Sequence, residues 1–165
     1  MTFATCVLGH HLLARLLQPA RMVWVSGDIY CMAKGHADPF LKTAGMDAYN
    51  RACLGRLLLA SEGGRRARET GAKSEVLCVH PGFVSSNFAA PNRLTKRMKE
   101  LMLISPKAGA QASIYAATCP WSDVPQDAFY FHNKRGWDRL AEDDPAKNAA
   151  AAKALFEQCD ALCGL

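Results

Sequence analysis

The sequence predicts an α/β fold in which parallel strands alternate with helices. Three short apolar runs, at residues 22–25, 76–79 and 129–131, are typical of strands covered on both faces. Helical patterns lie between and around these runs, and this order calls for parallel crossover connections. The chain has 165 residues and 50% of them are hydrophobic. This length suffices for one real core but not for two ordinary domains, so we expect a single domain over residues 1–165.

Apolar periodicity and helix-starting residues place the helices. The expected helices are residues 5–17, a long segment from about Met46, a short basic segment from Pro91, residues 105–118, and an alanine-rich segment opened by Asp144-Pro145. Ser105 followed by Pro106 is a favourable helix start, because serine caps the free N–H groups and proline fits the first turn. Residues 31–45 contain two glycines and a proline, so they are predicted to form a loop.

Composition and charge exclude several classes of function. The net charge is only +5, and the basic clusters lack interleaved aromatic residues, so we expect no nucleic-acid binding. No apolar run approaches the roughly 20 residues of a membrane span, so no transmembrane segment is expected. The basic segment 93–102 is interpreted as a substrate lid in preference to a membrane-surface anchor.

The seven cysteines are scattered and odd in number, which indicates a reducing compartment and not a disulfide framework. We therefore expect a cytoplasmic protein, with peripheral membrane association as the alternative. Cys31, His36 and the pair His10-His11 lack the paired spacing of a zinc site, so no metal site is predicted.

Four ordered motifs give the chain a resemblance to a known family. They are Leu8–Leu13 (LGHHLL), Ala20–Gly27 (ARMVWVSG), Ala48–Leu54 (AYNRACL) and His80–Ser86 (HPGFVSS). They resemble the N-x-L-G-H-F-L-L, A-R-I-V-x-V-S-S, A-Y-x-x-S-K-L and H-P-G-x-V-x-T motifs of the short-chain dehydrogenase/reductase family, in its retinol-dehydrogenase-like and WW-domain-oxidoreductase-like branches. The resemblance implies the C-terminal part of a Rossmann-like fold, a partial parallel sheet with helices on both faces. It also implies a parent activity of NAD(P)-dependent alcohol or carbonyl oxidoreduction on small lipophilic substrates.

The same resemblance implies that the catalytic set is incomplete. Tyr49 stands at the position of the family's general acid/base. Gly27 stands at the position of its serine, Cys53 at that of its lysine and Cys6 at that of its asparagine. Ser26 is either a shifted hydrogen-bond donor to substrate or a serine that bonds backbone, and the second is the commoner arrangement.

A tyrosine with an ordinary pKa near 10 needs a nearby cation to act at neutral pH. Cys53 cannot supply that cation. Arg51 lies two residues beyond Tyr49 and points elsewhere, and Arg56 lies about 10 Å further along the helix axis at about 1.5 Å per residue. Neither arginine is expected to replace the lysine.

The cofactor site is expected to be incomplete as well. The segment formed by Pro81, Gly82, Phe83, Val84 and Ser86 resembles the loop on the nicotinamide side, although a Pro-Gly pair after a strand is also an ordinary turn. The family's glycine-rich T-G-x-x-x-G-x-G turn does not occur in these residues. Because that turn holds the pyrophosphate, NAD or NADP is implied by the family but is not expected to bind this chain alone.

Three functional hypotheses follow. The first is a degenerate oxidoreductase homologue that lacks the N-terminal cofactor half and has weak activity or none. The second is a non-catalytic binding module that forms homo- or hetero-oligomers through an open sheet edge, because residues 22–25 would be central in the complete family sheet. The third is a full enzyme known only in part, and Gly27, Cys53 and Cys6 count against it.

Overall fold

A four-stranded sheet forms the centre of the protein in a computed structural model, which describes residues 2–33, 44–85, 103–125 and 129–165. The strands are β1 (Arg21–Val25), β2 (Glu75–His80), β3 (Tyr130–His132) and β4 (Gly136–Asp138), in the spatial order β1-β2-β3-β4. β1 pairs in parallel with β2, and β2 pairs in parallel with β3. β4 was not predicted; it runs antiparallel to β3 and closes that side of the sheet.

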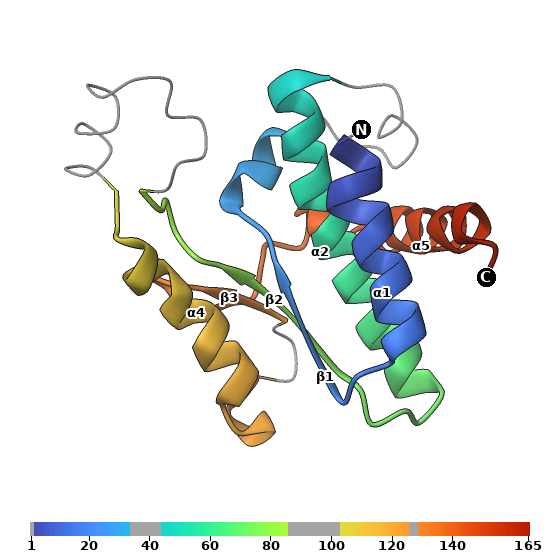
Figure 1. The fold of residues 1–165 in the computed structure, drawn as a ribbon. Coiled ribbons are helices and arrows are strands. Elements are labelled where there is room, and N and C mark those ends of the chain that lie inside the picture. The colour runs from blue at the N-terminus through green and yellow to red at the C-terminus, as the bar shows by residue number, and fades with distance from the viewer. Residues whose placement is uncertain (1, 34–43, 86–102, 126–128) are drawn as a thin grey trace.

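Helices cover both faces of this sheet (Figure 1). On one face lie α1 (Gly9–Leu17), α2 (Gly45–Glu69) and α5 (Ala149–Cys163), and on the other lies α4 (Pro106–Thr118). A turn of π-helix, Ala4–Leu8, leads into α1. The predicted α/β class with a partial Rossmann-like sheet and helices on both faces is therefore confirmed.

The two faces bury unequal cores, and the alternation of side chains along β2 separates them. Val76 and Cys78 point into the large cluster under α2 and α5, which includes Leu57, Leu58 and Leu155. Leu77 and Val79 point the other way, into a small cluster with Ala116 of α4. Burial on both faces explains why the strand is a continuous apolar run.

Local sequence signals account for most element boundaries. The Ser105 side chain accepts a hydrogen bond from the backbone N–H of Ala108 at 3.2 Å, as expected for the cap of α4. The alanine-rich helix begins later than predicted, because Pro145–Lys147 form a 3₁₀ turn and Asn148 caps α5. The predicted loop 31–45 overlaps a 3₁₀ turn at Asp28–Met32, and its residues 34–43 lie outside the described ranges, as does the predicted basic helix.

The outer side of β1 has no neighbouring strand in the part of the chain that the structure describes. A groove of about 430 Å³ runs there between α1 and β1, lined by residues that include Leu13, Leu17 and Val23. The side chains of Leu13 and Leu17 are 55% and 71% exposed. None of the described helices has both the length and the apolar character needed to cross a membrane.

Candidate active site

The residues assigned to chemistry gather where the parallel strands end. Gly27 and Asp28 follow β1, His80 ends β2 and His132 ends β3. The carboxyl ends of parallel strands are the usual ligand-binding edge of such a sheet. The fold therefore places the predicted serine position at the edge of the sheet where chemistry is expected.

Gly27 faces the ring of His80. Its backbone is extended, and a Cβ atom built on it would lie 3.6 Å from His80 Nδ1, which is ordinary contact. His80 is only 4% exposed, and neither of its ring nitrogens has a hydrogen-bond partner. Burial lowers the pKa of His80, against the opposing attraction of Asp28. A serine at position 27 would therefore fit and would point at an imidazole that lacks a partner.

Ser26 does not act as a shifted donor to substrate. Its side chain is buried and its Oγ donates a hydrogen bond to the carbonyl of Cys53 at 2.8 Å, while its backbone N–H donates to Val79. Ser26 thus joins the end of β1 to α2, in agreement with the second reading of this residue.

Tyr49 is half-buried on α2, and Cys53, one turn later, is fully buried. Burial raises the pKa of Tyr49, the Cys53 thiol adds to that rise, and the Arg56 guanidinium opposes it. At neutral pH the phenol is therefore protonated, and the site lacks a strong base at this position.

Arg56 lies closer to this pair than the sequence indicated. Its Nη2 approaches the sulfur of Cys53 to 3.2 Å. The expectation that Arg56 does not replace the lysine considered only the rise along the axis, whereas helical side chains lean toward the N-terminus of the helix. That lean brings the guanidinium back over the turn that carries Cys53, and the role of Arg56 stays a prediction.

Cys6 lies on the π-helical turn before α1 and is half-buried against the main core. Its carbonyl oxygen is 3.2 Å from His10 Nδ1. A thiol is only a weak hydrogen-bond donor and a weak acceptor, so Cys6 is a poorer member of a proton relay than a side-chain amide would be.

The loop after β2 is held by backbone contacts. Gly82 has φ +90°, a conformation that favours glycine, and a Cβ there would lie 2.8 Å from Ile104 Cδ1, so the Ile104 side chain would have to shift. The Pro81 carbonyl accepts a hydrogen bond from Asn133 Nδ2 at 2.9 Å, and Val84 forms a parallel bridge with Ile104. Phe83 is 64% exposed. Ser86, the last residue of the predicted cofactor loop, lies outside the described residues.

Asp28 organises a second group of side chains that the sequence did not reveal. One carboxylate oxygen accepts from the Tyr130 hydroxyl at 2.8 Å. The other lies 3.0 Å from His132 Nε2 and accepts from Arg135 Nη2 at 3.1 Å. His80 Nε2 lies 3.9 Å from the same oxygen. Only tertiary pairing of β1 with β2 and of β2 with β3 brings these residues together.

Asp28, His80 and His132 have the chemistry of a metal-binding set, and their potential ligand atoms all lie within 4.8 Å of one another. The hydrogen bonds of His132 oppose that use. Its Nδ1 accepts from the backbone N–H groups of Lys134 at 3.0 Å and Arg135 at 3.3 Å, so the ring hydrogen must sit on Nε2. A ligating histidine needs its lone pair toward the metal and its N–H on the other side. The described contacts therefore favour a hydrogen-bond network around Asp28.

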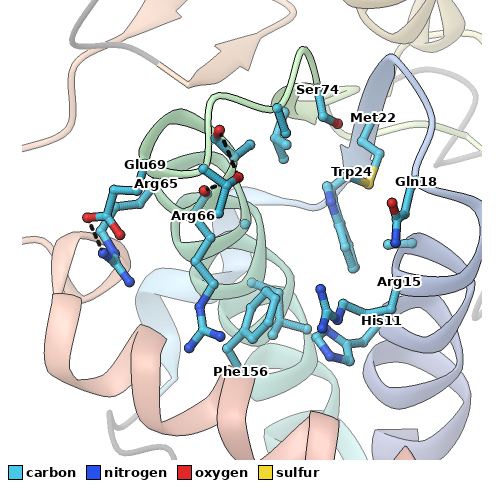
Figure 2. A pocket seen from close by; sticks show the side chains of 17 residues that line it. His11, Arg15, Gln18, Met22, Trp24, Arg65, Arg66, Glu69, Ser74 and Phe156 are labelled. Atoms are coloured by element: carbon cyan, nitrogen blue, oxygen red, sulfur yellow. Dashed lines mark hydrogen bonds and ion pairs between the residues drawn. The ribbon is translucent and has the colours of Figure 1, made fainter. Parts of the chain in front are cut away.

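A cavity of about 520 Å³ lies away from these groups, between α1, α2 and the first halves of β1 and β2. Figure 2 shows Phe156 on the wall of this cavity, with Arg66 on one side of its ring and His11 and Arg15 on the other. The guanidinium carbons of Arg15 and Arg66 lie 5.5 and 4.2 Å from the centre of the Phe156 ring. Both arginines form ion pairs, Arg15 with Asp160 and Arg66 with Glu62. The cavity therefore offers no unbalanced charge to a ligand.

A mostly parallel sheet covered on both faces, with a helix tyrosine and the four ordered motifs, is typical of the short-chain dehydrogenase/reductase family. The chain is 32% identical to human retinol dehydrogenase 14 over 182 aligned positions, which cover 100% of this chain and 52% of that protein. It is 31% identical to the WW domain-containing oxidoreductase of Danio rerio over 191 positions, which cover 98% of this chain and 43% of that protein. The predicted family relationship is thereby confirmed. The chain spans about half the length of these curated relatives.

The crystal structure of an uncharacterized protein from Mycobacterium paratuberculosis has a similar fold. Its TM-score is 0.67 at 26% sequence identity, and the match covers 95% of this chain and 56% of that one. No protein-family model matches the chain.

Proposed function

We propose that this chain is a degenerate short-chain dehydrogenase/reductase homologue whose activity, as it stands, is weak or absent. The parent activity is NAD(P)-dependent interconversion of alcohols and carbonyls, on small lipophilic substrates. The observation that carries the proposal is Tyr49 at the acid/base position with a raised pKa, beside a buried thiol. General acid–base help is worth about 10²–10⁴ in rate, and one placed donor about 10²–10³. Gly27 and Cys53 supply neither the hydroxyl nor the ammonium.

The described residues do not fit the phosphates of a dinucleotide. The N-terminus of α4, which follows β2 in the chain, is already capped by the side chain of Ser105. No glycine-rich turn joins a described strand directly to a helix. These residues would at most border the nicotinamide through Pro81–Val84. The chain by itself is therefore expected not to bind NAD or NADP, and no catalytic step is derived through the cofactor. Its free cysteines fit a reducing compartment such as the cytoplasm.

Restoring the two missing groups tests the proposal. A family N-terminal half is fused in front of the chain, and dehydrogenase activity is compared between the unmodified fusion, Gly27→Ser, and Gly27→Ser with Cys53→Lys. Activity should rise at each step, by about 10²-fold for the serine, because the extended backbone and the free space at residue 27 accept a side chain. Lysine at the buried position 53 would meet Arg56, so the double variant is also made with Arg56→Met.

Two results would contradict the proposal. One is an unmodified fusion as active as the repaired ones. The other is the 165-residue chain alone binding either cofactor in calorimetry with a dissociation constant in the low micromolar range.

A second candidate function is a non-catalytic binding module. The observation that favours it is the unpaired outer side of β1 with its apolar groove and exposed leucines. Such an edge is a template for a strand from another segment or subunit, and would support a homo- or hetero-oligomer.

A further inference from the structure

Tyr49, Cys53 and Arg56 occupy one face of α2, at positions i, i+4 and i+7. The Arg56 side chain leans toward the N-terminus of the helix, and its Nη2 lies 3.2 Å from the Cys53 sulfur. The guanidinium therefore lies beside Cys53, the position of the family lysine, and Tyr49 lies one turn earlier on the same helix.

No acidic side chain among the described residues forms an ion pair with Arg56. Its Nε is buried and has no hydrogen-bond acceptor. Three other arginines of α2 do pair with carboxylates: Arg51 with Asp47 at 2.9 Å, and Arg65 and Arg66 each with Glu62 at 2.7 Å. Within the described ranges, Arg56 is thus a half-buried cation without a carboxylate partner, and its field acts on Tyr49.

We propose that Arg56 supplies Tyr49 with the positive charge that Cys53 cannot provide, and so takes over the tuning role of the family lysine from one turn further along α2. The inference rests on the proposed function in one respect, that Tyr49 is the acid/base group. Arg56 acts through Tyr49 and is therefore a positioning residue. Neither the relatives described above nor the fold assigns it this task.

Two opposing effects determine the pKa of Tyr49. Burial and the adjacent thiol favour the neutral phenol, whereas a nearby guanidinium favours the phenolate. Burial is the larger effect, and the pKa of Tyr49 stays above its ordinary value. Arg56 therefore lowers the pKa of Tyr49 only in part, whereas the family lysine would lower it further. A partial effect agrees with the weak activity of the proposed function.

The titration of Tyr49 in the 165-residue chain tests this directly. Tyrosine ring carbons are labelled with ¹³C and followed by NMR against pH, with Tyr49→Phe to assign the signal. Tyr30 and Tyr130 do not interfere, because burial and carboxylate hydrogen bonds raise the pKa of each far above the working range. Arg56→Gln should lower the acid dissociation constant of Tyr49 about tenfold, and Arg56→Lys should retain most of the wild-type value. Cys53→Ala should act in the opposite direction.

Arg68→Gln, on the exposed end of the same helix, is the control and should leave the titration unchanged. A folded Arg56→Gln chain whose Tyr49 constant stays within about twofold of wild type would overturn the inference. If Arg56→Gln does not fold, the wild-type chain decides, because the Arg56 side-chain ¹⁵N signals must shift with the midpoint of Tyr49. Signals that stay constant through that midpoint overturn the inference equally. Neither measurement needs cofactor or substrate, so an inactive repaired fusion would refute the proposed function alone.

Discussion

The two edges of the sheet end in different ways. At the β4 edge, the last strand has three residues and follows a turn at residues 133–135. Its first residue, Gly136, has φ +77°, and the ring centre of Trp137 lies 5.1 Å from that of Phe131. Arg135 binds both Asp28 and Asp138 across this hairpin, at 3.1 and 3.2 Å. At the β1 edge, five residues of parallel strand border an apolar groove.

The two edge strands differ in how well they are protected against pairing with a further strand. Sheets protect an edge by making it short and charged, and β4 is three residues long and ends in Asp138, which pairs with Arg135. β1 is longer, its charged residue Arg21 lies only at its start, and Val25 at its end is 44% exposed. Among the described residues, β4 terminates the sheet on one side, whereas the outer side of β1 remains unpaired. This agrees with a chain that spans about half of its curated relatives.

The largest expected effect is on association through the β1 edge. The wild-type chain should associate as concentration rises, since the groove beside β1 exposes Leu13 and Leu17. Leu13→Glu with Leu17→Glu should weaken association at least about tenfold, because each buried leucine contributes about 1.5–3 kcal/mol. Light scattering at several concentrations measures it.

The matched control is Leu162→Glu, a substitution of a leucine on α5 that is similarly exposed at 51%. It should leave association unchanged. Hydrogen exchange completes the test, with about every second amide of residues 21–25 unprotected in the dissociated chain. A monomer in which all these amides are strongly protected would mean that another segment already fills the edge.

The next largest effect concerns the stability of the β4 edge. Trp137→Ala should lower the free energy of unfolding by about 2 kcal/mol, less than the 3–5 kcal/mol of a fully buried ring, because Trp137 is only half-buried. The ring contacts Phe131 and Tyr115, and those contacts are lost. Denaturant unfolding measures the change, and association should stay as in wild type. Stronger association in this variant would contradict the idea that only β1 is open.

The smallest expected effect is a pH dependence of the free energy of unfolding, caused by a histidine on the β1 side of the molecule. His11 of α1 is buried, and burial lowers its pKa although Asp160, 2.7 Å away, opposes the shift. The unfolded chain therefore binds more protons than the folded one below about pH 6.5, and the stability present above that pH falls on acidification. His80 contributes in the same sense.

Denaturant unfolding at pH 7 and pH 5 measures this dependence, and His11→Gln should reduce it. Since His11 joins α1 to α5, exchange at the β1 edge should rise more at pH 5 than exchange at β4. Equal changes at the two edges would show that His11 does not hold the groove wall specifically.

The sequence predicted the parallel part of the fold well, because continuous apolar runs and helix caps are local signals. It missed β4, since Gly136-Trp137-Asp138 has no run or alternation, and only Phe131 and Tyr115 give that strand a surface to pack on. It also began α5 too early, because proline after aspartate suits a 3₁₀ turn as well as an α-helix.

The candidate site was predictable only where a motif carried it. Tyr49, Gly27 and Cys53 came from family motifs, and their assigned roles stay predictions. The network of Asp28 with His132 and Arg135 joins residues more than 100 positions apart, which no local pattern reveals. A helical-face argument that includes the lean of side chains toward the N-terminus would have found Arg56.

The close contact between α4 and the loop after β2 has a consequence for how this chain tolerates mutation. A side chain at Gly109 would overlap Val84, and one at Gly82 would strike Ile104. Position 27, by contrast, has room for a side chain. A side chain is thus harder to accommodate at residues 82 and 109 than at residue 27. A serine at residue 27 is compatible with this fold, whereas a side chain at residue 109 would displace Val84 and loosen the contact between α4 and the loop.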